Sequence, residues 1–251
     1  MEDKATETGI YSVKNRGWFR VVRGIISVLV RLLTRFEICG QEHLPTHGPC
    51  LFVTNHLHWL DTPLIATAIP YRTYVFAGEK WAKHFLLGPL FRSIDAIFVQ
   101  RGEVDRNALR KALAVLAGGG FLGVAPEGTR SRTGGLQRGR RGPAYIALRT
   151  GVRLIPMAVT GGPEVFRELK RLRRARVRVV FGLPLDPPSL PAGQRPNAEQ
   201  QHELTEEIMY RIAALLPPAY RGVYGDLAEK RPDLLALHAS EGVPTLRERR
   251  S

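Results

Sequence analysis

Residues 50–69, CLFVTNHLHWLDTPLIATAI, decide how the fold of this chain is interpreted. The apolar run Cys50–Thr54 is typical of a short buried strand, and the pattern of Thr62–Ile69 is typical of a helix. Pro63 favours a helix that begins near Asp61, because proline is tolerated only in the first turn of a helix. The sequence therefore predicts a strand, a polar turn and a helix, with the turn at the carboxyl end of the strand.

The same alternation of apolar runs and helical patterns extends along most of the chain. The predicted strands are Cys50–Thr54, Thr73–Ala77, Ile94–Gln100, Phe121–Ala125, Arg153–Thr160 and Ala175–Phe181. The predicted helices are Thr62–Ile69, Lys80–Phe91, Val104–Leu116, Gly139–Thr150, Pro163–Arg171 and Asn197–Leu215. Strands that alternate with helices favour an α/β fold with a mostly parallel sheet flanked by helices.

Four segments describe the expected organisation of the 251 residues. They are a polar leader over residues 1–15, an amphipathic helix over 16–36, a globular domain over 37–216 and a C-terminal tail over 217–251. The leader has no basic region followed by an apolar core, so no secretory signal is expected. The tail beyond Tyr220 has no clear period and is expected to be partly mobile.

The N-terminal helix is predicted to be one-sided, with arginines on one face and apolar side chains on the other. Spanning a bilayer would place Arg23 and Arg31 near its centre at a cost of about 3 kcal/mol each. A helix that lies in the membrane interface avoids this cost, and its arginines then meet anionic headgroups. The alternative is an amphipathic helix that packs on the protein's own core. The predicted membrane contacts are Trp18, Phe19, Arg20, Arg23 and Arg31.

The charge balance indicates an anionic partner. Lys and Arg exceed Asp and Glu by 37 − 23 = 14. Such a surplus suits a membrane surface, a nucleic acid or a phosphorylated substrate, and does not choose among them. The two cysteines, Cys39 and Cys50, have no metal-ligand or disulfide spacing and are typical of a reducing cytosol.

Polar clusters follow three of the predicted strands. They are Asn55–Asp61, Arg101-Gly102 and Pro126–Ser131. In open α/β sheets, ligands bind outside the carboxyl ends of the strands. The three clusters are therefore expected to converge at one edge of the sheet and to form a single site.

His56 and Asp61 are the candidate acid–base pair. If residues 56–60 form a turn, the imidazole can fold back onto the carboxylate. A neutral imidazole can then take a proton from an alcohol, while the carboxylate fixes its tautomer and stabilises the imidazolium. The spacing alone also allows a simpler interpretation, in which Asp61 caps the helix beside an ordinary loop histidine.

The segment Glu127–Ser131 also allows two interpretations. Gly128 permits a tight turn, and the simpler interpretation is a loop with an exposed salt bridge. Functionally, the turn presents backbone N–H groups beside the guanidinium of Arg130, which together suit a phosphate. Arg101 could supply a second guanidinium, although a lone arginine at the end of a strand is usually just solvated.

Four blocks of residues resemble the 1-acylglycerol-3-phosphate O-acyltransferase family of glycerolipid acyltransferases. The blocks are NHLHWLD (55–61), IFVQRG (97–102), VAPEGTRS (124–131) and VRLIPMAV (152–159), and they occur in the family's order and spacing. The resemblance extends over roughly residues 17–215. The pairing of His, four residues and Asp with Pro-Glu-Gly-Thr-Arg-Ser is highly specific, and it favours the catalytic interpretation of His56.

The resemblance implies an O-acyltransferase that moves a fatty acyl group from a thioester to the free hydroxyl of lysophosphatidic acid, giving phosphatidic acid. By this resemblance, His56 is the general base and Asp61 orients it. The residues implied to bind the acceptor are Arg101, Glu127, Gly128, Thr129 and Arg130. Ile155 and Pro156 are implied to shape the acyl-donor site.

The resemblance also sets expectations for partners and location. The donor is expected to be acyl-CoA or acyl carrier protein, and no cofactor or metal is expected. The acceptor is a lysophospholipid, and the protein is expected on the cytoplasmic face of a membrane as a monotopic or peripheral enzyme. Three residues depart from the common family pattern. They are His58 where serine is frequent, Asp95 where glycine is frequent and Ala125 where phenylalanine is common.

Two alternatives to this function remain open at the level of sequence. One is an acyltransferase for another lysolipid or lipid-like alcohol. The other is a non-catalytic basic module that binds membranes or nucleic acid through Arg167–Val179, which has seven basic residues and one acid. That segment lacks the signatures of nucleic-acid-binding modules, so no nucleic-acid partner is expected.

Overall fold

The computed structural model describes residues 16–82, 96–99, 105–191 and 193–240. Seven strands within these ranges form one sheet in the order β1-β7-β6-β2-β5-β3-β4. Neighbouring strands run parallel except β6 and β7, which are antiparallel. The strands are β1 (Thr34–Cys39), β2 (Cys50–Thr54), β3 (Thr73–Gly78), β4 (Ile97–Val99), β5 (Phe121–Val124), β6 (Leu154–Thr160) and β7 (Ala175–Phe181). The prediction of a mostly parallel α/β sheet is confirmed.

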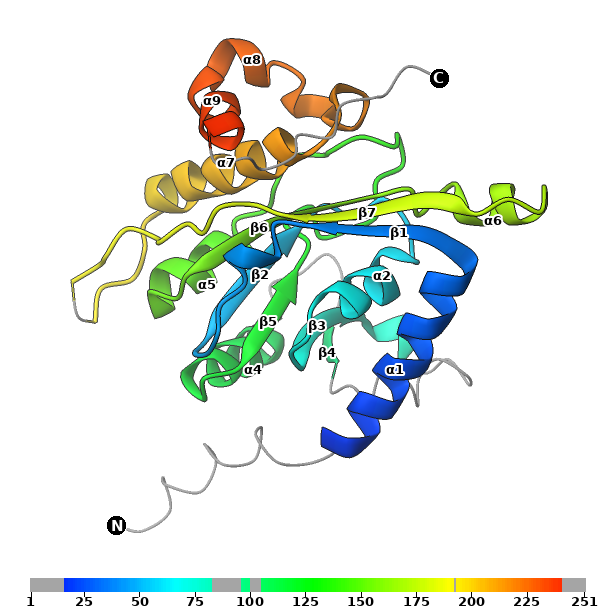
Figure 1. Cartoon of the computed structure of the whole chain (residues 1–251). Coiled ribbons are helices and arrows are strands. Elements are labelled where there is room, and N and C mark those ends of the chain that lie inside the picture. The colour runs from blue at the N-terminus through cyan, green and yellow to red at the C-terminus, as the bar shows by residue number, and fades with distance from the viewer. Residues whose placement is uncertain (1–15, 83–95, 100–104, 192, 241–251) are drawn as a thin grey trace.

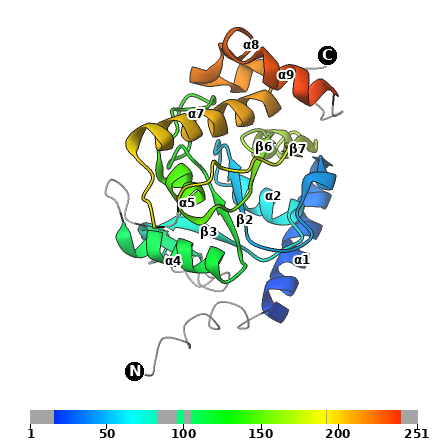
Figure 2. The same cartoon turned by 90° about the vertical axis from the view of Figure 1, so that its left-hand side faces the viewer.

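Helices cover both faces of the sheet (Figures 1 and 2). The helices on one face are α1 (Arg16–Leu33), α2 (Asp61–Ala68) and α6 (Val165–Leu169). Those on the other face are α4 (Arg106–Ala117), α5 (Gly142–Thr150), α7 (Ala198–Leu215), α8 (Leu227–Lys230) and α9 (Pro232–Ser240). Short 3₁₀ turns lie at Gln41–His43, Glu79–Trp81, Pro218–Tyr220 and Gly222–Tyr224.

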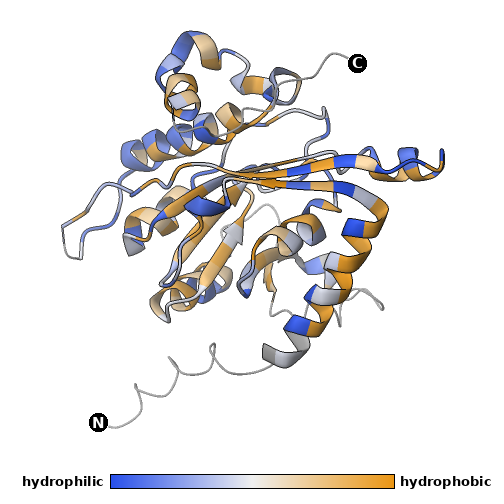
Figure 3. Cartoon of the chain, in the orientation of Figure 1, coloured by the Kyte–Doolittle hydropathy of each residue, from blue (hydrophilic) through white to orange (hydrophobic). Residues whose placement is uncertain are grey.

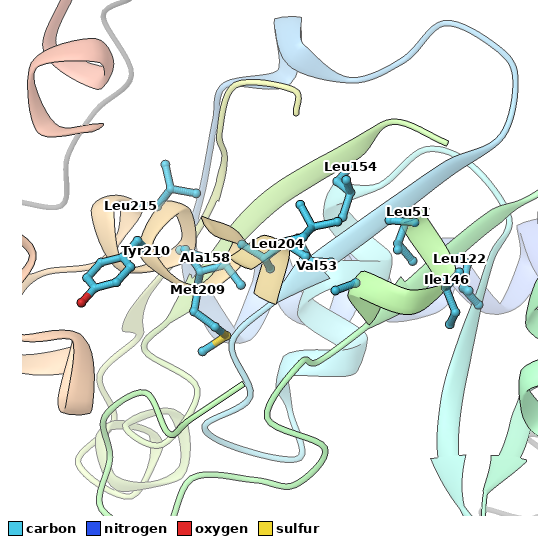
Figure 4. Close-up of a cluster of buried hydrophobic side chains, with 14 of the residues drawn as sticks. Leu51, Val53, Leu122, Ile146, Leu154, Ala158, Leu204, Met209, Tyr210 and Leu215 are labelled. Atoms are coloured by element: carbon cyan, nitrogen blue, oxygen red, sulfur yellow. The ribbon is translucent and has the colours of Figure 1, made fainter. Parts of the chain in front are cut away.

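The core lies on either side of the central strands β2 and β6, whose residues are all buried. Successive side chains of a strand point to opposite faces, so Leu51 and Val53 face α5 and α7 while Cys50 and Phe52 face α2. Figure 4 shows Leu51 and Val53 in the first of these two cores. Burial on both faces explains why these strands are continuous apolar runs in the sequence.

The first helix ends earlier than predicted. It was expected to reach Phe36, but α1 stops at Leu33 and residues 34–39 form β1, which was not predicted. β1 pairs in parallel with β7, from Thr34 opposite Ala175 to Cys39 opposite Val180. As an edge strand with Arg35 exposed, β1 carries too few apolar residues to show a strand pattern.

Residues 218–240 of the expected C-terminal tail contain regular structure that the sequence did not predict. These residues form 3₁₀ turns, α8 and α9, and Leu227 and Leu234 are buried. The ring of Tyr224 packs edge-on against Tyr210 of α7 with a centroid separation of 5.0 Å. Helices this short contain too few turns for a period to appear in the sequence.

Two predicted elements are only partly described. The expected helix Lys80–Phe91 overlaps the 3₁₀ turn Glu79–Trp81, and its remainder from residue 83 lies outside the described residues. The expected strand Ile94–Gln100 is represented by Ile97–Val99. No helix in the described part of the chain is both long enough and apolar enough to cross a bilayer.

Candidate functional site

A buried asparagine fixes the turn that carries the candidate base. Asn55 follows β2 directly, donates from Nδ2 to the carbonyl oxygen of Val159 over 2.9 Å, and accepts from the N–H of Val159 over 2.8 Å. Both bonds join the end of β2 to β6. Since the asparagine cannot shift without breaking them, the backbone of His56 starts from a fixed point.

One carboxylate oxygen of Asp61 binds several groups of the turn. Its Oδ2 accepts from the N–H groups of Leu57 and His58, each over 2.7 Å, and lies 3.2 Å from Nδ1 of His56. Asp61 is the first residue of α2, and within the described residues no hydrogen bond joins its carboxylate to that helix. The carboxylate therefore bonds back to the turn, as the catalytic interpretation requires, and does not act as a helix cap.

This arrangement determines which nitrogen of His56 is available. A carboxylate can only accept, so Nδ1 carries the proton that points to Asp61, and Nε2 is left with a free lone pair. Asp61 is buried, whereas the His56 side chain is 24% exposed. The pair can therefore receive a proton from a group that approaches from solvent.

His58 has different surroundings. Its Nδ1 lies 3.4 Å from the N–H of Leu60, which donates to it. Burial lowers the pKa of His58, and the nearby carboxylate of Asp61 opposes this shift. The neutral ring packs against Trp59 and Phe166, with centroid separations of 5.6 and 6.4 Å. His58 therefore belongs to an aromatic cluster beside the turn.

The loop after β5 holds the backbone of His56 from the other side. Glu127 Oε1 accepts from the N–H of His56 over 2.9 Å, and Oε2 accepts from the N–H of Gln137 over 2.9 Å. The N–H of Ser131 donates to the carbonyl oxygen of His56 over 2.7 Å. Burial raises the pKa of Glu127, and the two backbone bonds oppose this shift.

Glu127 was predicted to contact the acceptor, and the structure places it differently. The residue is 2% exposed and both carboxylate oxygens already accept from backbone amides. Its carboxylate therefore joins the two loops and does not face solvent. Sequence reasoning could not find this role, because nothing in the sequence signals that Gln137 returns to the same point.

The remainder of this loop presents positive charge. Gly128 is exposed and has φ 68°, a left-handed conformation that favours glycine. Arg130 is half-buried, and among the described residues it makes no ion pair. A side chain at Gly128 would lie 2.9 Å from Cδ and Nε of Arg140, so a second guanidinium crosses the loop there. Thr129 is half-buried.

The other predicted site residues are placed less directly. Arg101 lies outside the described residues. Ile155 is fully buried in the core beneath α2, and Pro156 is buried opposite Val53, so neither offers a surface to a donor. Both residues pack the strand that anchors Asn55, and their part in shaping the acyl-donor site stays a prediction.

Gly162 is a site residue that the sequence did not reveal. A Cβ at this position would lie 2.8 Å from Oδ1 of Asp61 and 3.4 Å from Cβ of His58. The second oxygen of Asp61, which accepts no hydrogen bond among the described groups, is therefore covered by bare backbone. Only a residue without a side chain leaves the carboxylate in place.

The N-terminal helix packs on the protein and exposes an apolar stripe as well. Nε of Arg23 donates to the carbonyl oxygens of Ala66 and Ile69, each over 3.1 Å, and its Nη2 donates to that of Thr67 over 3.3 Å. Arg23 therefore binds the C-terminal end of α2, a role that was not predicted, and its contact with a membrane stays a prediction. Arg20 and Arg31 are exposed. Trp18 and Phe19 lie in α1, but their side chains are outside the described part.

The apolar stripe of α1 consists of six side chains that are 43–65% exposed. They are Val21, Ile25, Val28, Leu29, Leu32 and Leu33. Figure 3 shows the hydrophobic character of this helix. One side of α1 therefore packs on the protein, and another side faces outward.

The fold and site together define a parallel α/β domain with a His–Asp pair at the carboxyl edge of its sheet. The family model described as Acyltransferase matches residues 35–160, half of the chain. The chain belongs to the acyltransferase family.

Curated proteins similar to this chain carry a more specific name than the family model does. A 1-acyl-sn-glycerol-3-phosphate acyltransferase of Borreliella burgdorferi is 30% identical over 151 residues, 56% of this chain and 58% of the relative. One of Cocos nucifera is 29% identical over 157 residues, 58% of this chain and 48% of the relative. The chain thus spans about half the length of these curated relatives.

A solved structure has the same fold. The 1-acyl-sn-glycerophosphate (LPA) acyltransferase PlsC from Thermotoga maritima superposes with a TM-score of 0.58 at 24% identity. The match covers 79% of this chain and 81% of that one. This likeness extends the shared architecture well beyond the segment that the family model matches.

Proposed function

We propose that this protein transfers a fatty acyl group from an acyl thioester to the free hydroxyl of lysophosphatidic acid, producing phosphatidic acid. The observation that carries the proposal is the bond between His56 and Asp61, beside a turn held from both sides, which leaves Nε2 of His56 without a partner among the described residues. The names of the similar proteins support the choice of acceptor.

The reaction needs one proton acceptor and no acyl-enzyme. Nε2 of His56 takes the proton of the acceptor hydroxyl while its oxygen attacks the thioester carbonyl. The imidazolium is stabilised by the buried carboxylate of Asp61. The carbon–sulfur bond then breaks, and the proton passes to the leaving thiolate, which departs as free thiol. Either acyl-CoA or acyl carrier protein can serve as the donor in this scheme, and no cofactor takes part.

The acceptor phosphate is assigned to the arginines around the loop of residues 127–130. Arg130 and Arg140 make no ion pairs in the described part of the chain, so both guanidinium groups are available to an anion. Arg101 is expected to join them. An acceptor without a phosphate would leave these charges unpaired, and this disfavours neutral lipid-like alcohols.

We also propose that the protein works at an anionic membrane surface, on its cytoplasmic face. The exposed stripe of α1 supports the contact with a membrane, because an apolar helix face is normally covered. An assay of the purified chain with a panel of lysolipids and both donor types tests the proposal, with phosphatidic acid detected by mass spectrometry. Absence of phosphatidic acid with every donor, from protein that unfolds cooperatively on heating, would refute it.

A further inference from the structure

A second exposed apolar surface lies next to the candidate site. Trp59 and Phe166 are each 47% exposed, and their rings stack with a centroid separation of 5.8 Å and an interplanar angle of 24°. Leu172, in the loop between α6 and β7, is 97% exposed. Trp59 belongs to the turn between His56 and Asp61, so this surface adjoins the proposed base directly.

The side chains around these three residues are predominantly basic. Residues 164–174 contain five arginines and lysines and two glutamates, a surplus of 5 − 2 = 3. All five basic residues are exposed, and four of them, Arg167, Lys170, Arg171 and Arg173, have no bond to α1 in the described part of the chain. Arg167 and Arg171 share a single partner, Glu168, at 3.6 and 3.8 Å. Apolar side chains within a basic border are typical of a surface that meets anionic lipid.

Sheet topology brings this surface to the same edge as the end of α1. β7 runs antiparallel to β6 and parallel to β1, so the first residues of β1 and β7 lie beyond the carboxyl end of β6. Arg174 Nε donates to the carbonyl oxygen of Thr34 over 3.1 Å, and its Nη2 also bonds to the carbonyl oxygen of Arg31. Figure 1 shows α6 and the C-terminal end of α1 at the same end of the molecule.

We propose that Trp59, Phe166 and Leu172, with the basic side chains around them, form a second lipid-facing surface. This surface binds an anionic bilayer and holds the turn that carries His56 against it. The inference rests on the proposed function, and it adds how the protein is oriented on the membrane. Binding through α1 alone would leave the orientation of the protein on the membrane undefined. Two contacts at one edge would hold the site toward the lipid. The acceptor could then enter the site without leaving the membrane surface.

The test uses Trp59 as its own reporter in the full chain. With Trp18→Phe and Trp81→Phe in place, Trp59 is the sole tryptophan. Its emission is recorded with phosphatidylcholine vesicles, with or without phosphatidylserine, that carry brominated acyl chains. We expect a blue shift and quenching with the anionic vesicles. Unchanged emission from protein that still co-sediments with those vesicles would overturn the proposal, because α1 alone would then make the contact.

Variants separate apolar insertion from charge. Leu172 has φ 55°, a conformation in which glycine is unstrained, so Leu172→Gly should keep or raise the melting temperature. It should nevertheless weaken vesicle binding at least about fivefold, through loss of apolar burial. Val223→Ser is the control, since Val223 is 57% exposed and lies in the 3₁₀ turn Gly222–Tyr224, which contacts α7. Equal losses of vesicle binding in Leu172→Gly and Val223→Ser would contradict a specific lipid-facing surface.

Charge removal and activity complete the test. Replacing Arg167, Lys170, Arg171 and Arg173 together by glutamine should abolish the preference for phosphatidylserine; a preserved preference would contradict the basic border. Acyl transfer to lysophosphatidic acid in detergent micelles should be the same in Leu172→Gly as in the parent chain. If the parent shows no transfer while Trp59 is quenched, the proposed function fails and the membrane surface stands.

Discussion

At the scale of single residues, the guanidinium of Arg130 has no ionic partner among the described groups and lies on the loop that binds the backbone of His56. If it binds the acceptor phosphate, Arg130→Ala should raise KM for lysophosphatidic acid about tenfold, since it removes charge-assisted hydrogen bonds already present in the ground state. An acceptor that lacks the phosphate should be affected much less. Arg132→Ala, at an exposed position two residues away, is the control. Equal effects on both acceptors would contradict the phosphate assignment.

Glu127 is expected to act on the reaction through His56. In Glu127→Gln, one of the two backbone N–H groups loses its acceptor, which costs about 1–3 kcal/mol of folding free energy. The turn would loosen, so kcat should fall while KM for lysophosphatidic acid stays nearly constant. Thermal unfolding and steady-state kinetics measure the two effects. Glu203→Gln, an exposed change on α7, should alter neither. A raised KM with unchanged kcat would restore the predicted substrate contact.

At the scale of elements, Arg23 joins α1 to α2. The last carbonyl groups of a helix lack partners within it, and Arg23 binds three at the end of α2. Arg23→Ala should lower the free energy of unfolding by about 1–3 kcal/mol. Arg20→Ala, exposed on the same helix, should leave it unchanged. If both variants unfold at the same denaturant concentration as the parent chain, the docking of α1 on α2 does not stabilise the fold.

The apolar stripe of α1 makes a separate prediction. Val28→Asp with Leu32→Asp should release most of the protein from anionic vesicles, because both side chains are more than half exposed and would carry charge into the interface. The melting temperature should hardly change. Co-sedimentation measures the effect, and high salt should weaken binding by the parent chain. A truncation for the same purpose must end before Thr34, because β1 pairs with β7. Full retention of the double variant on vesicles would exclude α1 as the anchor.

At the scale of the whole molecule, the strands that the sequence predicted well have a clear apolar run or a clear alternation of apolar and polar residues. β2 and β7 have the predicted limits, because each is a continuous apolar or alternating run bounded by polar residues. β1 was missed because a half-exposed edge strand carries charged residues such as Arg35 and Glu37. α8 and α9 were missed because they are stabilised by packing on α7 and not by their own periodicity.

The site also contains features that could be predicted from the sequence and features that could not. The position of Pro63 made the approach of His56 to Asp61 possible, because it sets where α2 begins, but only the resemblance to the acyltransferase family favoured that approach over a helix cap. The partners of Glu127, the position of Arg140 across Gly128 and the approach of Gly162 to Asp61 all depend on segments far apart in the sequence. Such contacts are set by tertiary packing, and no local pattern reports them.

The central claim is that His56 is the base, and its most direct test compares two neighbouring histidines. His56→Ala should lower kcat for acyl transfer to lysophosphatidic acid by at least about 10²-fold, while the dissociation constant of that lipid stays unchanged. His58→Ser should retain substantial activity, since the His58 ring packs in the aromatic cluster and makes no hydrogen bond to the Asp61 carboxylate among the described groups. Full activity in His56→Ala, or a loss in His58→Ser as deep as that expected for His56→Ala, would contradict the account.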